Sequence, residues 1–539
     1  MRQVAASVDL IETPLVTLIR IGEEQDFPEG WTIFYTRIQQ QHPGDFGVTL
    51  RLGKMLRLLG DSEGATRFLT AAVSIRPQSA FARSELGRAL LSKGRVDEAI
   101  AAQREAIRLA PGEATYRLRM GIALLWKPGL EQDAAAAFSE ATRVAQGAHG
   151  SRGAAGIQFV AANVYVQKGK LDEAITAYRE AARLVPDDPH SRHHLGLVLD
   201  KKGLLDESIA AHRESARLQP QEHVAHSALA AVLNKKGLWD EAAGAYRAAI
   251  RLQPENAWLH HLLGDACAHA GRFAEAEAAF REAIRLEPND GGRHHNLGDV
   301  LREQHKFGDA SAEYSEAIRL RPEVHASHYG LGSVYAFCGQ WDQAAPPFER
   351  AAELNPADLG SSYRWATLCV HNNDMEGYRR ACCAMLDRFG ETNDIQVADS
   401  TTRACALAPN LASDAMRVAK LVDLVLAGTE AHPARRSFEV TKALVEYRVG
   451  RFGSAAEAIG HLSPAGDGTH RDVLAFSILA MAQQRQGNVE DARTSMSKAQ
   501  RILSTEMPDV AKGQTFGEDW HEWLHAQILC LEAEKLLKE

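Results

Sequence analysis

Small and bulky apolar residues recur along this chain with a period of 34 residues. From residue 155 to residue 358, six consecutive segments each place a small residue, a ring four positions later and a proline near the end. Spacings of three and four residues put such side chains on one face of a helix. The small residues are Ala174, Ser208, Ala242, Ala276, Ala310 and Ala344; the rings are Tyr178, His212, Tyr246, Phe280, Tyr314 and Phe348; the prolines are Pro186, Pro220, Pro254, Pro288, Pro322 and Pro356.

Most segments contain the signals of two helices joined by a tight turn. A Leu-Gly pair such as Leu263-Gly264 falls within the first helix, where glycine lets a neighbouring helix approach closely. A glycine such as Gly237 marks the turn, because it adopts a positive φ easily. Acidic residues such as Asp240 and Glu241 follow at the positive end of the second helix, and the proline ends that helix because it lacks an amide donor.

A fixed period of 34 residues, with Leu-Gly early and proline late, resembles the tetratricopeptide repeat family. The resemblance covers most of the chain. It implies an all-α fold, a right-handed superhelical solenoid of helix-turn-helix repeats in which contacts between neighbours supply nearly all the stability.

The strength of the repeat pattern varies along the chain and predicts its domain organisation. Three repeats precede the six and begin near residues 46, 80 and 114. We expect an N-terminal helical cap at 1–45, repeats one to three at 46–146, an exposed loop insertion at 147–154, repeats four to nine at 155–358, a divergent helical region at 359–435, and divergent repeats with a C-terminal capping helix at 436–539.

Composition and charge exclude several classes of partner, site and cellular location. A net charge of -9 argues against nucleic acid or a membrane surface as the general partner. The seven cysteines are scattered without a C-x-x-C pair, so neither a disulfide framework nor a zinc ribbon is indicated. The start of the chain lacks the pattern of a signal peptide, and no apolar run is long enough to span a membrane, so we expect a cytoplasmic protein.

The sequence contains no motif of a catalytic centre. A Gly-x-Ser-x-Gly nucleophile elbow and a Gly-x-x-x-x-Gly-Lys-Ser/Thr phosphate loop are both missing. Asp45-Phe46-Gly47 matches the metal-binding tripeptide of protein kinases, but no catalytic loop or glycine-rich loop accompanies it, and Asp45 is expected to cap the next helix. We predict a protein that is not an enzyme and needs no cofactor or metal.

Histidines at two adjacent repeat positions are the most informative polar residues. His226, His260, His294 and His328 occupy a position that in the family is often aromatic and packs between helices. The next position holds His193, His261, His295 and Tyr329, and the resemblance places it on the concave groove. His261 with Asp265, and His295 with Asp299, are i, i+4 pairs on one helix face. Such pairs suit a divalent metal, a bound peptide or a solvated polar groove. We predict peptide contacts at Trp258, His261, Asp265, His295, Asp299, Arg302 and Tyr329.

Lysines recur at the end of the first helix in three successive repeats: Lys168, Lys201-Lys202 and Lys235-Lys236. Their simplest role is to complement the helix dipole in solvent. The alternative is a basic strip beside Asn234 that receives an acidic peptide or a C-terminal carboxylate, and Lys201, Asn234 and Lys235 are its candidate contacts. This resembles the carboxylate clamp of chaperone adaptors, but the clamp positions of that family hold His, Ser, Leu and Ala here.

Four stretches are similar to repeat arrays that follow serine/threonine-kinase domains in planctomycete-type bacterial proteins. They are residues 42–46, 377–380, 385–390 and 519–534. We therefore predict a non-enzymatic scaffold or adaptor that binds a protein or peptide partner in its groove. The alternative is a regulatory or substrate-recruiting module of a bacterial serine/threonine-kinase signalling system.

Overall fold

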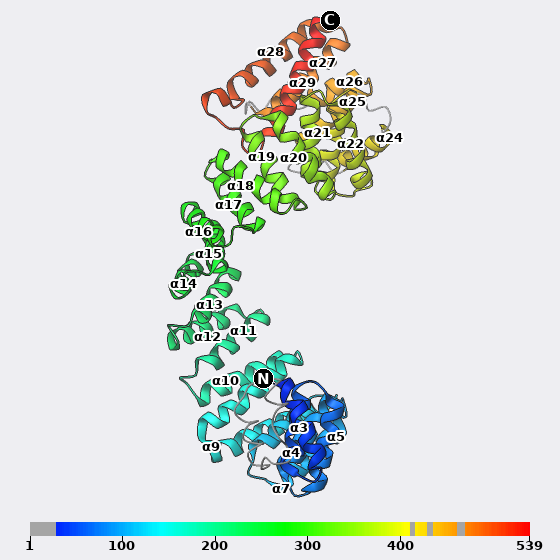
Figure 1. The fold of residues 1–539 in the computed structure, drawn as a ribbon. Coiled ribbons are helices and arrows are strands. Elements are labelled where there is room, and N and C mark those ends of the chain that lie inside the picture. The colour runs from blue at the N-terminus through cyan, green and yellow to red at the C-terminus, as the bar shows by residue number, and fades with distance from the viewer. Residues whose placement is uncertain (1–27, 410–414, 428–434, 461–468) are drawn as a thin grey trace. The chain divides into compact units, whose positions relative to one another are not determined.

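The structure is a computed structural model that describes residues 28–409, 415–427, 435–460 and 469–539. All regular structure in these ranges is helical, and most helices follow one another in antiparallel pairs (Figure 1). The chain forms two compact units, which we call unit 1 (Met1–Gln253) and unit 2 (Pro254–Glu539). The predicted all-α fold of stacked helix pairs is confirmed.

Unit 1 begins with a single described helix, α3, and continues as helix pairs. Residues 1–27 of the predicted N-terminal cap lie outside the described residues. The helices are α3 (Pro28–Gln41), α4 (Phe46–Leu58), α5 (Ser62–Ile75), α6 (Ala80–Ser92), α7 (Val96–Leu109), α8 (Ala114–Leu124), α9 (Glu131–Gln167), α10 (Leu171–Leu184), α11 (Pro189–Lys201), α12 (Leu205–Leu218), α13 (His223–Lys235) and α14 (Trp239–Leu252).

Unit 2 starts with helix pairs of the same design and ends with longer, less regular ones. Its helices are α15 (Ala257–His269), α16 (Phe273–Leu286), α17 (Gly291–Glu303), α18 (Phe307–Leu320), α19 (His325–Phe337), α20 (Trp341–Leu354), α21 (Leu359–His371), α22 (Met375–Phe389), α23 (Ile395–Ala406), α24 (Ala415–Ala427), α25 (Arg435–Arg448), α26 (Phe452–Gly460), α27 (His470–Arg485), α28 (Val489–Glu506), the 3₁₀ turn η1 (Val510–Lys512) and α29 (Trp520–Lys538).

The repeated sequence signals have the structural roles predicted for them. A Cβ atom on Gly264 would lie 2.7 Å from the Phe280 ring, so the glycine is needed where the two helices of a pair meet. The turn glycine Gly237 has φ 79°. Asp45 caps α4 by accepting a hydrogen bond from the Val48 amide at 2.8 Å.

A side chain on the first helix of a pair links it to the proline that ends the preceding repeat. Nε2 of the histidine lies within hydrogen-bond distance of the proline carbonyl oxygen in four successive repeats: His226–Pro220 at 3.1 Å, His260–Pro254 at 2.8 Å, His294–Pro288 at 3.1 Å and His328–Pro322 at 3.0 Å. Arginine makes the same link in two earlier repeats, from Arg83 to Pro77 and from Arg117 to Pro111. These histidines therefore hold successive repeats together, as the packing interpretation of the sequence expected.

Residues 147–154 form helix rather than the exposed loop that we predicted. They lie inside α9, which is interrupted only at Gly150, where φ is 65° and ψ is -163°. A positive φ is easy for glycine and redirects the chain without a loop. The residues around Gly150 are exposed, so this break joins the second helix of one pair to the first helix of the next.

His212 is a buried polar residue in the repeat core of unit 1. Its side chain is fully buried on α12, at the position where the other pairs of residues 155–358 have tyrosine or phenylalanine, and both ring nitrogens lack a hydrogen-bond partner among the described residues. Burial lowers the pKa of His212 to about 4. The imidazole is therefore neutral in the folded protein, and two polar atoms are buried without compensation.

Replacing His212 with phenylalanine is expected to raise the free energy of unfolding of unit 1 by about 1–2 kcal/mol at pH 7. The gain should grow as the pH falls from 6.5 towards 4, because only the unfolded wild type takes up a proton on this side chain in that range. Urea unfolding at pH 7 and pH 5 measures both effects. His190→Gln, on the exposed end of α11, is the matched control. A less stable phenylalanine variant would contradict the prediction.

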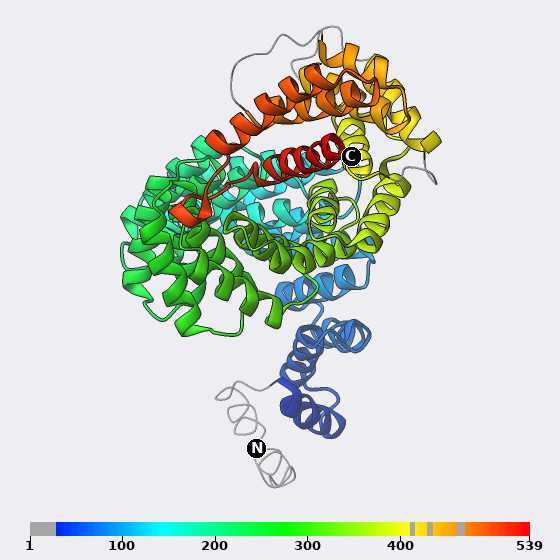
Figure 2. The ribbon, with the colours of Figure 1, turned by 90° about the horizontal axis from the view of Figure 1, so that it is seen from above.

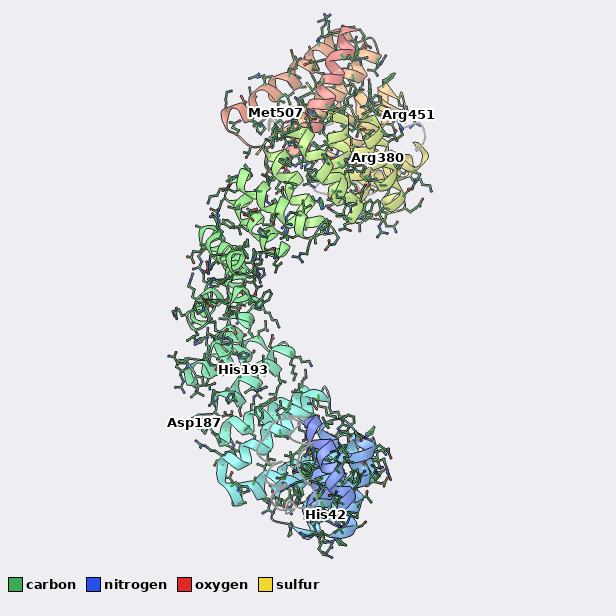
Figure 3. The ribbon with its side chains drawn as sticks, in the orientation of Figure 1. His42, Asp187, His193, Arg380, Arg451 and Met507 are labelled. Carbon is green, nitrogen blue, oxygen red and sulfur yellow. The ribbon has the colours of Figure 1, made fainter. Side chains whose placement is uncertain are left out.

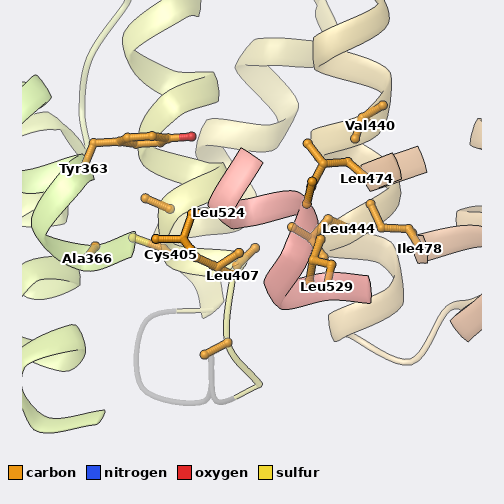
Figure 4. Close-up of a cluster of buried hydrophobic side chains, with 14 of the residues drawn as sticks. Tyr363, Ala366, Cys405, Leu407, Val440, Leu444, Leu474, Ile478, Leu524 and Leu529 are labelled. Atoms are coloured by element: carbon orange, nitrogen blue, oxygen red, sulfur yellow. The ribbon is translucent and has the colours of Figure 1, made fainter. Parts of the chain in front are cut away.

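The C-terminal helix α29 does more than cover the last repeat. Following the segment that begins at Met507 (Figure 3), it contacts α21, α27 and α28 and lies inside the curve that the helices of unit 2 form around it (Figure 2). Leu524 and Leu529 are fully buried there, in a cluster with side chains of α25 and α27 (Figure 4). The curved array of unit 2 is thus filled, at its C-terminal part, by the chain itself.

Candidate binding groove

The first helices of successive pairs in unit 2 hold most of the predicted contact residues. An open hollow of about 660 Å³ lies along α17, α19 and α21. Four predicted residues line it: His295, Asp299, Arg302 and Tyr329. Four further polar residues, outside the predicted set, also line it: His325, Asn355, Asp358 and Arg364.

Asp299 is held in place by its neighbours on α17 and α18. The Tyr314 hydroxyl donates a hydrogen bond to Asp299 Oδ1 at 2.5 Å, and His295 Nε2 lies 3.4 Å from Asp299 Oδ2. Burial, reinforced by the Asp299 charge, raises the pKa of Tyr314, so the phenol stays protonated and remains a donor. The carboxylate and the imidazole therefore present a fixed polar surface to the hollow.

Two arginines face the hollow from different helices. The guanidinium of Arg364 lies over the Tyr329 ring, with its central carbon 5.2 Å from the ring centre. Its Nη1 donates a hydrogen bond to the Gly360 carbonyl at 3.4 Å, whereas its Nη2 is 3.9 Å from a carboxylate oxygen of Glu518, which is beyond hydrogen-bond distance. Arg302 donates one hydrogen bond to Glu303 at 3.0 Å. The two side chains thus keep donors that can bind an acidic or carbonyl group.

A second polar group lies on α15. Trp258 is 56% exposed and stacks on the His261 ring, with ring centres 5.0 Å apart. His261 Nε2 is 3.3 Å from Asp265 Oδ2, while the Asn296 side chain donates to Asp265 Oδ1 at 3.0 Å. Burial raises the pKa of Asp265 despite these partners. The exposed indole is an aromatic anchor point next to a fixed polar pair.

The His-Asp pairs do not assemble into a larger ligand set. Within the described parts of the chain, no group of three or more His, Cys, Asp or Glu side chains is placed to hold a metal ion. Each pair offers one imidazole and one carboxylate, fewer than the four ligands typical of a structural zinc site.

The predicted lysine strip lies in unit 1, whereas the other predicted contacts lie in unit 2. Lys235 is paired with Asp200 at 2.6 Å, and Lys201 is exposed at the end of α11. Asn234 Oδ1 is buried and has no hydrogen-bond partner among the described residues. The neighbouring lysines of the pattern, Lys202 and Lys236, pair with acidic residues that begin the second helix of the preceding repeat, so part of the strip's charge is already neutralised.

The stretches that resemble kinase-associated arrays have roles in the fold. Asp45 is a helix cap, Met385 and Leu386 are buried in α22, and Trp520 is fully buried at the start of α29. No described helix combines the length and the apolar character needed to cross a membrane.

Comparison with known proteins identifies the repeats. Models of the tetratricopeptide repeat match residues 59–114, 84–150, 228–291, 295–358 and 473–496, and a model described as a TPR repeat matches residues 162–203. No curated protein matches the chain.

Solved structures similar to parts of the chain include other repeat proteins. MamA residues 41 to the end, from Desulfovibrio magneticus RS-1, is 21% identical, with a TM-score of 0.30, covering 31% of this chain and 95% of MamA. YrrB, described as a TPR protein with an unusual peptide-binding site, is 19% identical, with a TM-score of 0.32, covering 37% of this chain and 98% of YrrB. The C-terminal part of a TPR repeat-containing protein from Cytophaga hutchinsonii is 15% identical, with a TM-score of 0.39, covering 45% of this chain and 98% of the Cytophaga chain. The family models together match more than half of the residues, and the chain belongs to the tetratricopeptide repeat family.

Proposed function

We propose that this protein is a non-enzymatic scaffold that binds a peptide segment of a protein partner along α15, α17, α19 and α21 of unit 2. The observation that carries the proposal is the open hollow lined by Asp299, Arg302, Tyr329 and Arg364. In it, Arg364 Nη2 is 3.9 Å from Glu518, and Arg302 donates one hydrogen bond to Glu303. Tetratricopeptide repeat proteins generally bind protein or peptide partners and are typically scaffolds without catalytic activity.

The side chains of this surface are ordered before any partner arrives. Tyr314 holds Asp299, and Asn296 holds Asp265, so binding costs little receptor entropy. A peptide that places an acidic group against Arg364 and an apolar group against Trp258 would use both kinds of contact that the surface offers.

Replacing His295, Arg302 and Tyr329 together with alanine is expected to weaken partner binding by at least about tenfold. The partner is first captured from a lysate of the source cells, and its affinity for the purified chain is then measured by fluorescence anisotropy. Arg285→Ala/Arg319→Ala is the matched control, because each of these exposed arginines forms an ion pair with a glutamate of its own helix. Equal affinity for the triple variant, the control and the wild type would place the binding site elsewhere.

The alternative, a substrate-recruiting module of a serine/threonine-kinase system, stays a prediction. Its support is the resemblance of four stretches whose residues also serve the fold. Identification of a kinase or of kinase substrates among the captured partners is the result that would favour it.

A further inference from the structure

Three arginines in unit 1 converge on one buried carboxylate. Glu85 on α6 is 1% exposed. Its oxygens lie 3.6 Å from Arg57 Nε on α4, 3.3 Å from Arg88 Nη1 on α6 and 3.0 Å from Arg119 Nη2 on α8. These helices are the first members of three successive pairs, and α6 contacts both α4 and α8. We call Arg57, Arg88 and Arg119 the arginine cluster.

The arginine cluster has more hydrogen-bond donors than its one carboxylate can accept. Each guanidinium carries about five N–H groups, whereas a carboxylate has two oxygens. Arg119 uses one more donor on Ser84 Oγ at 2.8 Å. Arg57 Nε is buried without a hydrogen-bond partner among the described residues, because its distance to Glu85 is too long for a hydrogen bond.

The charge of the arginine cluster is also unbalanced. Three cations face one anion at a site where the side chains of Arg57 and Arg119 are only 14% and 17% exposed. Burial, and then the charge of Arg88, lowers the pKa of Arg57. Burial also lowers the pKa of Arg119, although Glu85 acts in the opposite direction. An incoming anion would relieve this repulsion.

Exposed apolar side chains lie beside the arginine cluster on the same helices. Phe81, which is 40% exposed, lies one turn before Glu85 on α6, and Lys54 Nζ is 5.3 Å from its ring centre. Leu58 is 69% exposed and lies one turn after Lys54 on α4. Residues four apart share a helix face, so cations and apolar side chains form one mixed surface.

We propose that the arginine cluster is a docking site for an acidic peptide segment of a protein partner, whose carboxylates bind Arg57, Arg88 and Arg119 and whose apolar side chains pack against Phe81 and Leu58. This site lies in unit 1, and the proposal does not depend on the groove of unit 2. A peptide fits better than a nucleic acid, because the whole chain carries a net charge of -9 and the cationic surface is local and partly apolar.

The test is fluorescence anisotropy with a short labelled peptide of alternating glutamate and leucine. The full chain carries the triple alanine replacement of His295, Arg302 and Tyr329, because the groove of unit 2 is itself proposed to bind acidic and apolar groups. A peptide with glutamine in place of glutamate is the matched probe. We expect the glutamate peptide to bind at least about tenfold more tightly, and its affinity to fall as salt is added. Equal affinity for the two peptides would overturn the proposal.

Two variants move the affinity in opposite directions. Arg57→Gln removes a cation that makes no direct hydrogen bond to Glu85, and it should weaken binding of the glutamate peptide about tenfold without loss of helicity. Glu85→Gln removes the competing carboxylate and should tighten binding. The control Arg108→Gln, at an exposed arginine of α7 that pairs with Glu105, should change nothing.

Unchanged affinity in the folded Arg57→Gln variant would reduce the arginine cluster to a structural network and overturn the proposal. A labelled single-stranded oligonucleotide that binds more tightly than the glutamate peptide would also overturn it, in favour of nucleic acid. Neither result bears on the groove of unit 2, whose triple variant leaves the arginine cluster intact.

Discussion

Replacing Arg403 with methionine is expected to lower the free energy of unfolding of unit 2 by about 3–5 kcal/mol. Arg403 on α23 donates to Glu522 on α29 at 2.9 Å, and Asp399 lies 3.6 Å from its second amino group. Both side chains of the Arg403–Glu522 pair are only 13% exposed. Although burial raises the pKa of Glu522, the charge of Arg403 and of nearby histidines lowers it to about 2. Methionine would leave this carboxylate buried and ionised without its main partner.

The double variant Arg403→Met/Glu522→Gln separates the charge from the packing. It should recover most of the lost stability, because no charge of this pair is then left unpaired. Arg493→Met is the control, since its ion pair with Glu490 is exposed and should contribute less than about 1 kcal/mol. Urea unfolding, together with hydrogen exchange of α21 and α29, measures the effect in unit 2. A loss below about 1 kcal/mol for Arg403→Met would contradict the prediction.

Lowering the pH from 7 to 4 is expected to destabilise unit 2 by on the order of 5 kcal/mol. Two histidines of α29 are shielded from water: His525 is fully buried, 2.7 Å from Thr367 Oγ1 and 3.3 Å from the Tyr363 hydroxyl, and the side chain of His521, the neighbour of Glu522, is 14% exposed. Burial lowers the pKa of His525 to about 3 and that of His521 to about 4, although the Glu522 charge acts in the opposite direction.

The direction of the pH effect follows from these depressed pKa values. Above pH 6.5 both histidines are neutral in the folded and unfolded states, so their full stability contribution is present. Between 6.5 and about 4 the unfolded chain takes up protons first, and stability falls by about 1.4 kcal/mol per pH unit for each histidine. Glu522 adds a loss in the same direction only below its ordinary pKa of 4.5, because its folded pKa is about 2.

Urea unfolding at several pH values tests this window. The variant His521→Gln/His525→Asn removes both titrating groups and should flatten the dependence between pH 6.5 and 4.5. Stability of the wild type that is constant down to pH 4 would contradict the prediction.

The regular repeats could be predicted from the sequence because every signal is local. Gly264 and Phe280 are 16 positions apart within one hairpin, and the same contact between a glycine and a ring recurs at Gly196–His212, Gly298–Tyr314 and Gly332–Phe348. The glycine-rich composition of the segment around Gly150 predicts a loop, but the segment lies in α9. Its remaining residues accept helical geometry, and a single positive φ is enough to turn the chain.

The candidate groove could be predicted only where the repeat phase is clean. The positions of His295, Asp299 and Tyr329 within the 34-residue repeat predict that they face the groove, and the three residues line one hollow. Arg364 lies 34 residues after Gly330 and was missed because α21 falls in the region that we called divergent. Its neighbour Glu518 is 154 positions away, and no periodic pattern connects the two.

Two further features of unit 1 have a signal in the sequence. Lys202 pairs with Asp172, and Lys236 with Asp206, at a spacing of 30 residues in both cases. Glu85 and Arg119 are one period apart, so opposite charges at the same repeat position indicated the ion pair.

The link from a histidine or arginine to the proline carbonyl has a consequence for how such a chain evolves. The acceptor is a main-chain oxygen, which every residue type supplies, and the donor is a single side chain six residues later. Any repeat that carries the donor can follow any repeat that ends in the same turn. Duplication or deletion of whole 34-residue periods that carry this link therefore leaves the joints between them with compatible partners, and the length of the array can change while these contacts do not.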